Sequence, residues 1–119
     1  MADELEVTAK LRHLRIAPQK VRLVVDVVRG KEANEALDML RFMPQKAAEP
    51  VYKLIQSAIA NAEENFGLEA EDLFVSQIYA DDGPRNRLRP YGGRFGARGR
   101  FKPIINRTSH VTVVLTERF

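Results

Sequence analysis

The chain has 119 residues, of which 45% are hydrophobic, enough to fill one modest core but not two, so we expect a single domain over residues 1–119. It contains no cysteine, which excludes disulfides, thiolate nucleophiles and thiolate metal sites and favours a reducing, cytoplasmic compartment. No stretch approaches the roughly 18 apolar residues of a membrane span, so we expect no membrane partner.

The formal net charge of +3 conceals a sharp division along the chain. Residues 1–82 hold 10 Lys and Arg against 15 Asp and Glu, net −5, whereas residues 83–119 hold 9 against 1, net +8. No acid occurs from Gly83 to Thr116. Such one-sided charge predicts a polyanionic partner. Arg dominates this stretch, and because guanidinium binds phosphate through paired hydrogen bonds and stacks on bases, nucleic acid is favoured over a membrane surface.

Apolar periodicity and helix-ending residues predict three helices between strands. The expected elements are a strand over residues 7–15, helices from Pro18 to Gly30, from Ala33 to the residue before Pro44 and from Ala47 to Gly67, and strands over residues 73–80 and 110–116. Val111, Val113 and Leu115 alternate with His110, Thr112 and Val114, so we expect the last strand to pack mainly on one face.

Basic, glycine-rich sequence joins the last two strands, and the simplest connection is an antiparallel hairpin over residues 73–116 with its tip near Gly92, Gly93 and Gly96. About 20 residues per arm at roughly 3.3 Å each give a ribbon on the order of 65 Å, which must project from the body. The predicted fold class is α+β, with three helices packed on a small antiparallel sheet. The body would comprise residues 1–82 and 103–119, and the extended basic hairpin about residues 83–102.

Two basic groups are candidates for binding RNA. The ribbon group comprises Arg85, Arg87, Arg89, Arg94, Arg98, Arg100, Lys102 and Arg107. The body group comprises Lys10, Arg12, Arg15, Lys20, Arg22 and Lys31, with Arg29 beside them and Asp26 as the one acid between Lys10 and Lys31. The alternatives are a flexible solvated loop for the first group and an ordinary solvated helix face for the second.

Chemistry-bearing motifs are weak elsewhere. The glycines from Gly92 to Gly99 resemble an arginine-glycine RNA-binding segment, whereas the match to the GXXG loop of KH domains lacks the flanking helices. His13 and His110 are far apart in sequence, and Ser109 lacks a positioned third partner, so we expect no catalytic triad and no enzyme. We also expect no metal, because the acids from Glu63 to Asp72 lack the spacing of a metal-binding loop. We expect no cofactor and no small-molecule substrate either.

Five segments, taken in order and spacing, closely resemble the ribosomal protein L twenty-two family of the large subunit, in its bacterial type. They are Ala17–Val24, Arg29–Lys31, Ser57–Glu63, Asp82–Pro84 and Arg107–Val114, and the likeness covers residues 10–118. The resemblance implies an α+β body with a long hairpin, and a structural protein that binds large-subunit ribosomal RNA and supports its assembly. It also implies RNA contacts by Arg107, Thr108, Ser109 and His110.

The resemblance further implies that the hairpin tip helps line the peptide exit tunnel, opposite ribosomal protein L four and near the nascent peptide. The residues at the corresponding place are Tyr91, Gly92, Gly93, Arg94 and Phe95. This tip is longer and richer in glycine than the common family pattern, and Ala17 stands where many members have a serine helix cap. The alternative function is a free-standing nucleic-acid-binding protein, either an RNA chaperone or a DNA architectural protein.

Overall fold

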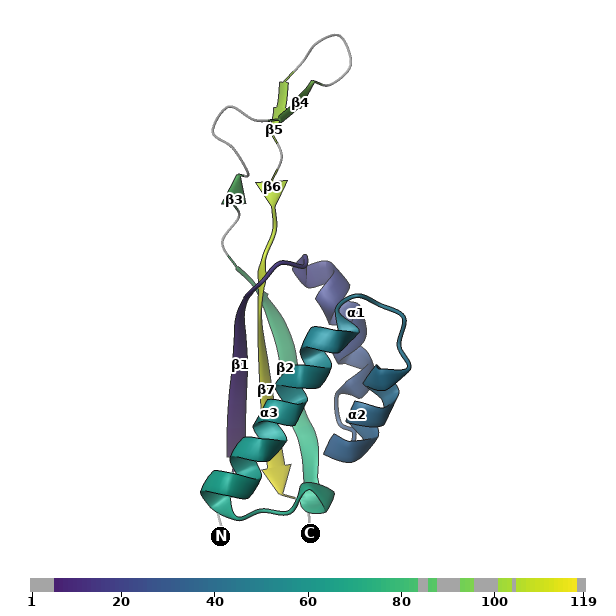
Figure 1. Cartoon of the computed structure of the whole chain (residues 1–119), viewed down its shortest axis with the longest axis vertical. Coiled ribbons are helices and arrows are strands. Elements are labelled where there is room, and N and C mark those ends of the chain that lie inside the picture. Colours follow the sequence, from purple (N-terminus) through teal and green to yellow (C-terminus); the bar gives the residue numbers. More distant parts are fainter. Residues whose placement is uncertain (1–5, 84–85, 88–92, 96–100, 104, 118–119) are drawn as a thin grey trace.

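The structure is a computed structural model that describes residues 6–83, 86–87, 93–95, 101–103 and 105–117. One layer of helices covers one face of a small sheet (Figure 1). The elements are β1 (Glu6–Leu14), α1 (Pro18–Val28), α2 (Ala33–Arg41), α3 (Ala48–Phe66), the 3-10 turn η1 (Ala70–Asp72), β2 (Leu73–Asp82), β3 (Asn86–Arg87), β4 (Gly93–Phe95), β5 (Phe101–Pro103), β6 (Ile105–Asn106) and β7 (Ser109–Glu117). The predicted α+β class, with three helices on an antiparallel sheet, is confirmed.

The helices form where apolar spacing predicts them. In α1, Val21, Val24, Val25 and Val28 are all buried, which satisfies the predicted stripe. Ala17 precedes this helix and accepts no capping hydrogen bond, because its side chain has no oxygen that could accept one from the first-turn N–H groups. In α3 the buried stripe runs from Ala48 to Ala62. The helix ends because the next residue, Gly67, adopts a left-handed conformation with φ 64°, which a glycine reaches without strain.

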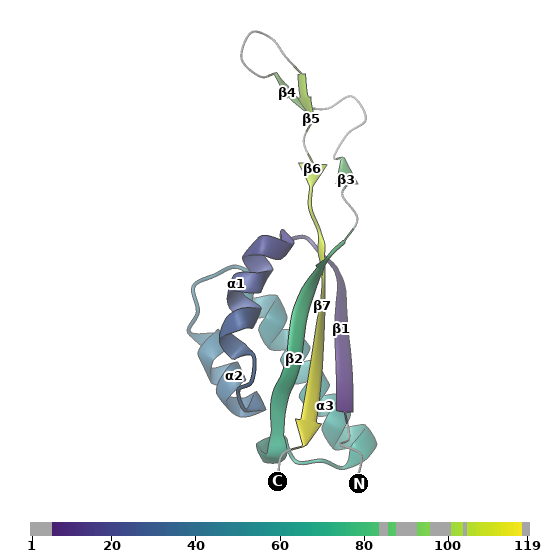
Figure 2. The ribbon, with the colours of Figure 1, turned by 180° about the vertical axis from the view of Figure 1, so that it is seen from behind.

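The main sheet has the strand order β1-β7-β2, and both pairs are antiparallel. The helix-covered face includes Leu11, Val111 and Ala80, which lie opposite one another across the three strands. The other face, uncovered by helices in Figure 2, carries the row Lys10, Thr112 and Tyr79. This register follows from the period of two in a strand, which separates the apolar core side from the polar side.

The prediction that the last strand packs mainly on one face is wrong. In β7, Thr112, Val114 and Thr116 are buried together with Val111 and the other core-facing residues. The reason is the position of β7 in the centre of the sheet, where side chains of β1 and β2 flank it on both sides. Alternation in sequence shows which side chains face the helices, but it does not show that neighbouring strands cover the opposite side chains.

The outer edge of β2 is covered along most of its length. The backbone of the segment after α1 pairs with it, since Gly30 N–H donates to the Val75 carbonyl at 2.9 Å and Val75 N–H donates to the Lys31 carbonyl at 2.8 Å. Farther along, Arg22 donates to the Ala80 carbonyl and Arg29 to the Ile78 carbonyl. These bonds satisfy edge groups that would otherwise be free to pair with another chain.

Beyond the main sheet, β3 pairs with β6 and β4 with β5, again antiparallel (Figure 1). Gly93 lies opposite Pro103 within β4 and β5, and Phe95 lies opposite Phe101. The chain therefore reverses between Phe95 and Phe101, an interval that includes the predicted tip position 96. Of the three predicted tip glycines, Gly93 lies in β4, whereas those at positions 92 and 96 fall outside the described residues. β2 also extends two residues past the predicted end. One continuous hairpin, and its boundary with the body, stays a prediction.

Candidate nucleic-acid interface

Four cations from four separate segments surround a hollow of about 480 Å³, which we call the cradle. They are Arg15, Lys20, Lys46 and Arg107. None of the described residues that line the cradle is acidic. Four positive charges gathered without a counter-charge are costly in an isolated protein and favourable beside a polyanion, so the cradle has the electrostatic character of a phosphate-binding surface.

The cradle is assembled by a contact between the start of β7 and the turn before α1. Ser109 is fully buried, and its hydroxyl donates a 2.9 Å hydrogen bond to the carbonyl of Ile16. Ile16 follows Arg15, and Arg107 precedes Ser109 by two residues, so this bond brings the two arginines to one surface. Lys20 stands in the first turn of α1, where its backbone N–H bonds the Ala17 carbonyl at 3.0 Å.

The N-terminus of α1 adds to the positive potential of the cradle. Ala17, the residue that precedes the helix, lines the cradle, and the first turn of α1 contains no acid. The first N–H groups of a helix have no carbonyl acceptor within it, and the helix dipole places partial positive charge there. Side-chain cations and the helix end therefore act in the same direction.

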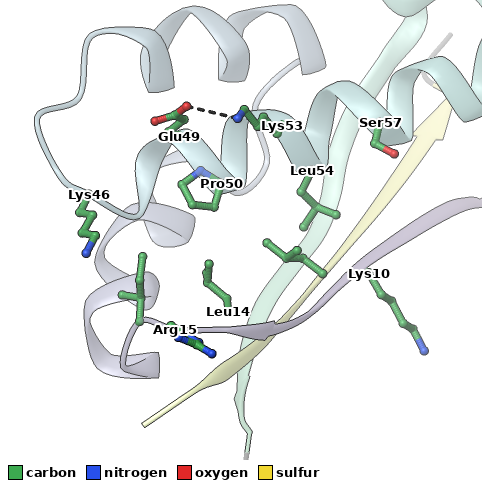
Figure 3. A pocket seen from close by; sticks show the side chains of 11 residues that line it. Lys10, Leu14, Arg15, Lys46, Glu49, Pro50, Lys53, Leu54 and Ser57 are labelled. Carbon is green, nitrogen blue, oxygen red and sulfur yellow. Dashed lines mark ion pairs between the residues drawn. The ribbon is translucent and has the colours of Figure 1, made fainter. Parts of the chain in front are cut away.

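Beside the cradle, a second hollow of about 600 Å³ lies between β1 and α3, and we call it the groove. Its lining is largely apolar and includes Leu11, Leu14, Ile16, Pro50 and Leu54. In Figure 3, Leu14 points into the groove from the β1 side and Leu54 from the α3 side, where Pro50 also lies.

Charged side chains stand at the mouth of the groove. Arg15 and Lys46 belong to both the groove and the cradle. On α3, Lys53 pairs with Glu49 at 3.3 Å, and both side chains are mostly exposed. Lys10 also borders the groove but extends away from Leu14 and Leu54 in Figure 3. The groove is thus an apolar hollow whose mouth has an excess of positive charge.

A third hollow, of about 300 Å³, is lined by residues of β1, β2 and β7. Lys10, Arg12, His13, His110 and Asp81 line it together with Thr112. His13 has a left-handed φ of 59° at an irregularity in the β1 ladder, and its backbone N–H donates to Nδ1 of His110 at 3.0 Å. This bond ties the irregular part of β1 to the start of β7.

The structure distributes the predicted RNA-binding residues unevenly. Arg15, Lys20 and Arg107 meet in the cradle, and Lys10, Arg12 and His110 gather at the third hollow. The guanidinium of Arg22 bonds the Ala80 carbonyl. Lys31 lies just after the C-terminal end of α1, whereas the cradle is at the N-terminal end of that helix.

Two predicted contact residues lie below the surface. Thr108 is 4% exposed and Ser109 is 0% exposed, so neither offers a surface for direct contact with RNA in this conformation. Their contact with RNA stays a prediction, and the bond from Ser109 to Ile16 gives that residue a role in holding the cradle together. The resemblance that suggested them carries no information about burial.

The other predicted ribbon and tip residues are divided between the short strands and the part of the chain outside the described residues. Arg87 lies in β3, Gly93, Arg94 and Phe95 in β4, and Lys102 in β5. The remaining predicted residues, Arg85, Arg89, Tyr91, Gly92, Arg98 and Arg100, are outside the described residues. Contacts of all these residues with RNA or with the tunnel stay predictions.

Two cations were missed from the sequence, namely Lys46 in the cradle and Lys53 at the mouth of the groove. They stand near the start of α3, far along the chain from the basic group that ends at Lys31. In sequence Lys46 is a lone cation before a helix, and Lys53 has Glu49 four residues earlier, which is the ordinary pattern of a solvated helix face. Only the packing of α3 against β1 brings them to this surface.

Other chemistry finds little support in the described part of the chain. No group of three or more His, Cys, Asp or Glu residues there could hold a metal ion, and none of its helices has the length and hydropathy required to cross a bilayer. Arg41 lies outside the cradle, and its pKa is raised, chiefly by the hydrogen bond its guanidinium donates to the Tyr52 hydroxyl. Arginine is charged at neutral pH in any case, so this shift confers no switch.

A small α+β body that gathers several cations at one hollow is typical of a structural nucleic-acid-binding protein. The chain belongs to the family described as Ribosomal protein L22p/L17e, whose model matches residues 9–116. It is therefore a protein of the large ribosomal subunit that binds ribosomal RNA, and its family is one of structural proteins rather than enzymes. The resemblance noted in the sequence is confirmed.

Proposed function

We propose that the cradle binds phosphate groups of large-subunit ribosomal RNA and fixes the body of the protein to one folded site. The observation that carries this proposal is the meeting of Arg15, Lys20, Lys46 and Arg107 at one acid-free hollow within the described structure. Each cation that neutralises a phosphate releases condensed counterions, which makes such binding strong and dependent on salt. The four cations come from segments up to 92 residues apart, so only the folded body presents them together.

The basic sequence beyond the main sheet extends this interface. In Figure 1 the short strands β3, β4, β5 and β6 lie beyond the point where β2 ends and β7 begins. The sequence from Gly83 to Thr116 contains no acid. Inserted between RNA helices, such a segment neutralises phosphates that would otherwise repel one another. This provides a physical route by which the protein supports assembly of the large subunit in the cytoplasm.

The proposal also assigns a role to the residues around the chain reversal. They help line the peptide exit tunnel, opposite ribosomal protein L four and in reach of the nascent peptide. The support is the family membership together with the position of β4 and β5 farthest from the body (Figure 1). No chemical step is required of them, because a tunnel wall acts through shape and charge.

A binding experiment with a charge reversal tests the cradle. The variant Lys20→Glu/Arg107→Glu should bind purified large-subunit ribosomal RNA at least about tenfold more weakly, because each lost phosphate contact removes a favourable counterion release. Competition with transfer RNA separates the alternative function, since a general nucleic-acid binder is displaced equally by any RNA. Unchanged affinity of the variant, or equal displacement by transfer RNA, would contradict the proposal.

A further inference from the structure

The groove between β1 and α3 has an apolar floor that the protein itself leaves uncovered. Leu11, Leu14, Ile16 and Pro50 are only partly buried, in contrast to the core-facing valines of α1, which are fully buried. Those core-facing valines are Val21, Val24, Val25 and Val28. Apolar side chains that gather around a hollow of about 600 Å³ fall within the usual size range of small-molecule binding sites. Something apolar therefore fits this floor better than water does.

The mouth of the groove selects the kind of molecule that can fill it. Arg15 and Lys46 stand at the boundary with the cradle and line both hollows. The acid at the mouth, Glu49, is already neutralised by its 3.3 Å ion pair with Lys53. A chain of phosphates held in the cradle therefore passes the mouth of the groove without meeting an uncompensated negative charge.

We propose that the groove binds one unstacked nucleotide of the ribosomal RNA, with its base between Leu14 and Leu54 and its phosphate at Arg15 and Lys46. The faces of a base are apolar and suit an aliphatic floor, while its polar edges need donors and acceptors. The Ser57 hydroxyl on α3 and the Arg15 guanidinium at the mouth supply them within the same lining. This inference rests on the proposed function, because it requires RNA in the cradle.

A nucleotide is favoured over an apolar protein segment by charge complementarity. Two of the cations at the mouth are shared with the cradle, so the ligand in the groove must be compatible with RNA bound next to it. A nucleotide of the same strand satisfies this through the covalent backbone. The consequence is sequence or shape specificity, because a phosphate clamp alone does not distinguish one RNA site from another.

The test fills the groove without changing charge. Ser57 lines the groove and is exposed, whereas its neighbour Gln56 is exposed on α3 but does not line it. Ser57→Trp should weaken binding to purified large-subunit ribosomal RNA about tenfold, in keeping with the loss of one buried base, while the salt dependence stays unchanged. Gln56→Trp is the matched control and should bind like the unsubstituted protein. Leu14→Gln, which makes the floor polar, is a second variant with the same expectation.

Chemical probing of the bound RNA locates the effect. One base should be protected from base-modifying reagents by the unsubstituted protein and by Gln56→Trp, and become reactive with Ser57→Trp, while backbone protection by the cradle persists. If folded Ser57→Trp and Leu14→Gln both bind RNA normally, the nucleotide proposal is overturned. It is overturned in favour of a protein occupant if those variants bind RNA normally yet enter subunits poorly. Failure of the unsubstituted protein to bind RNA would instead overturn the proposed function.

Discussion

The guanidinium of Arg22 donates two hydrogen bonds to the carbonyl oxygen of Ala80, 3.2 Å from Nε and 3.0 Å from Nη2. Seven residues later, directly after the last residue of the same helix, Arg29 makes the equivalent pair of bonds to the Ile78 carbonyl. The two arginines, about two helical turns apart, therefore bond carbonyls two residues apart on β2, and these bonds hold α1 to the edge of the sheet at two points. Arg22 is thus a structural residue, whatever it also contributes to RNA binding.

Replacing Arg22 by Ala should lower the free energy of unfolding by about 1 kcal/mol. Hydrogen bonds from charged groups contribute roughly 1.5–3 kcal/mol, and the exposure of Arg22 reduces that value. Lys20→Ala is the matched control, since Lys20 is exposed in the first turn of the same helix and should change stability by less than about 0.5 kcal/mol. Denaturant unfolding measures both variants. Equal stability of the two would show that the bonds to Ala80 contribute nothing.

Gly83→Ala should destabilise the junction between the sheet and the basic strands. A Cβ on Gly83 would overlap the Thr108 hydroxyl oxygen and lie 3.2 Å from the Thr108 carbonyl carbon and oxygen. Overpacking of this kind costs about 1–3 kcal/mol. Thr108→Ala removes the closest atom, so the double variant should lose less stability than the sum of the two single changes. Strict additivity in a double-mutant cycle would rule out the predicted contact.

If the cradle binds phosphates, each of its cations should add to the salt dependence of the affinity for ribosomal RNA. Lys20→Ala and Arg107→Ala should each reduce the slope of log affinity against log salt for ribosomal RNA by about 0.7, the value of one phosphate contact on single strands. Lys31 follows the opposite end of α1, on the order of 16 Å away at 1.5 Å per residue, and Lys31→Ala should leave the slope unchanged. Affinity titrations at several salt concentrations decide this. An equal effect of Lys31→Ala would extend the interface along the whole helix.

Excising residues 88–101 and closing the arms with a short turn should leave the body folded. Every core residue in the described part of the chain lies outside this segment. Loop shortening changes the closure entropy by only a few tenths of a kcal/mol to about 1 kcal/mol. The variant should still enter large subunits through the cradle, while its ribosomes respond differently to drugs and stalling peptides that lodge in the exit tunnel. Normal assembly with both responses unaltered would show that this segment does not line the tunnel.

Much of this fold can be predicted from the sequence because the signals are local. Pro18 and Gly67 bracket helices whose apolar stripes are regular, and these positions are observed as expected. The burial of Val114 and the coverage of the β2 edge were not predictable in this way. Both depend on which strands become neighbours, a property of the whole sheet rather than of any segment.

The candidate site was less predictable than the fold. Charge in sequence identified Arg15, Lys20 and Arg107, but Lys46 joins them only through the packing of α3. Ser109 was expected at the RNA surface, whereas its hydroxyl is buried and bonds Ile16. Sequence reveals how many cations a segment holds, while the fold decides which of them face the same partner.

Co-sedimentation of tagged protein with purified large subunits through a high-salt wash tests whether the cradle fixes this protein to the large ribosomal subunit. The unsubstituted protein should remain with the subunits, and Lys20→Glu/Arg107→Glu should be depleted although it folds. If the unsubstituted protein washes off, or if the reversed variant is retained equally, the cradle does not anchor the protein and the account is contradicted.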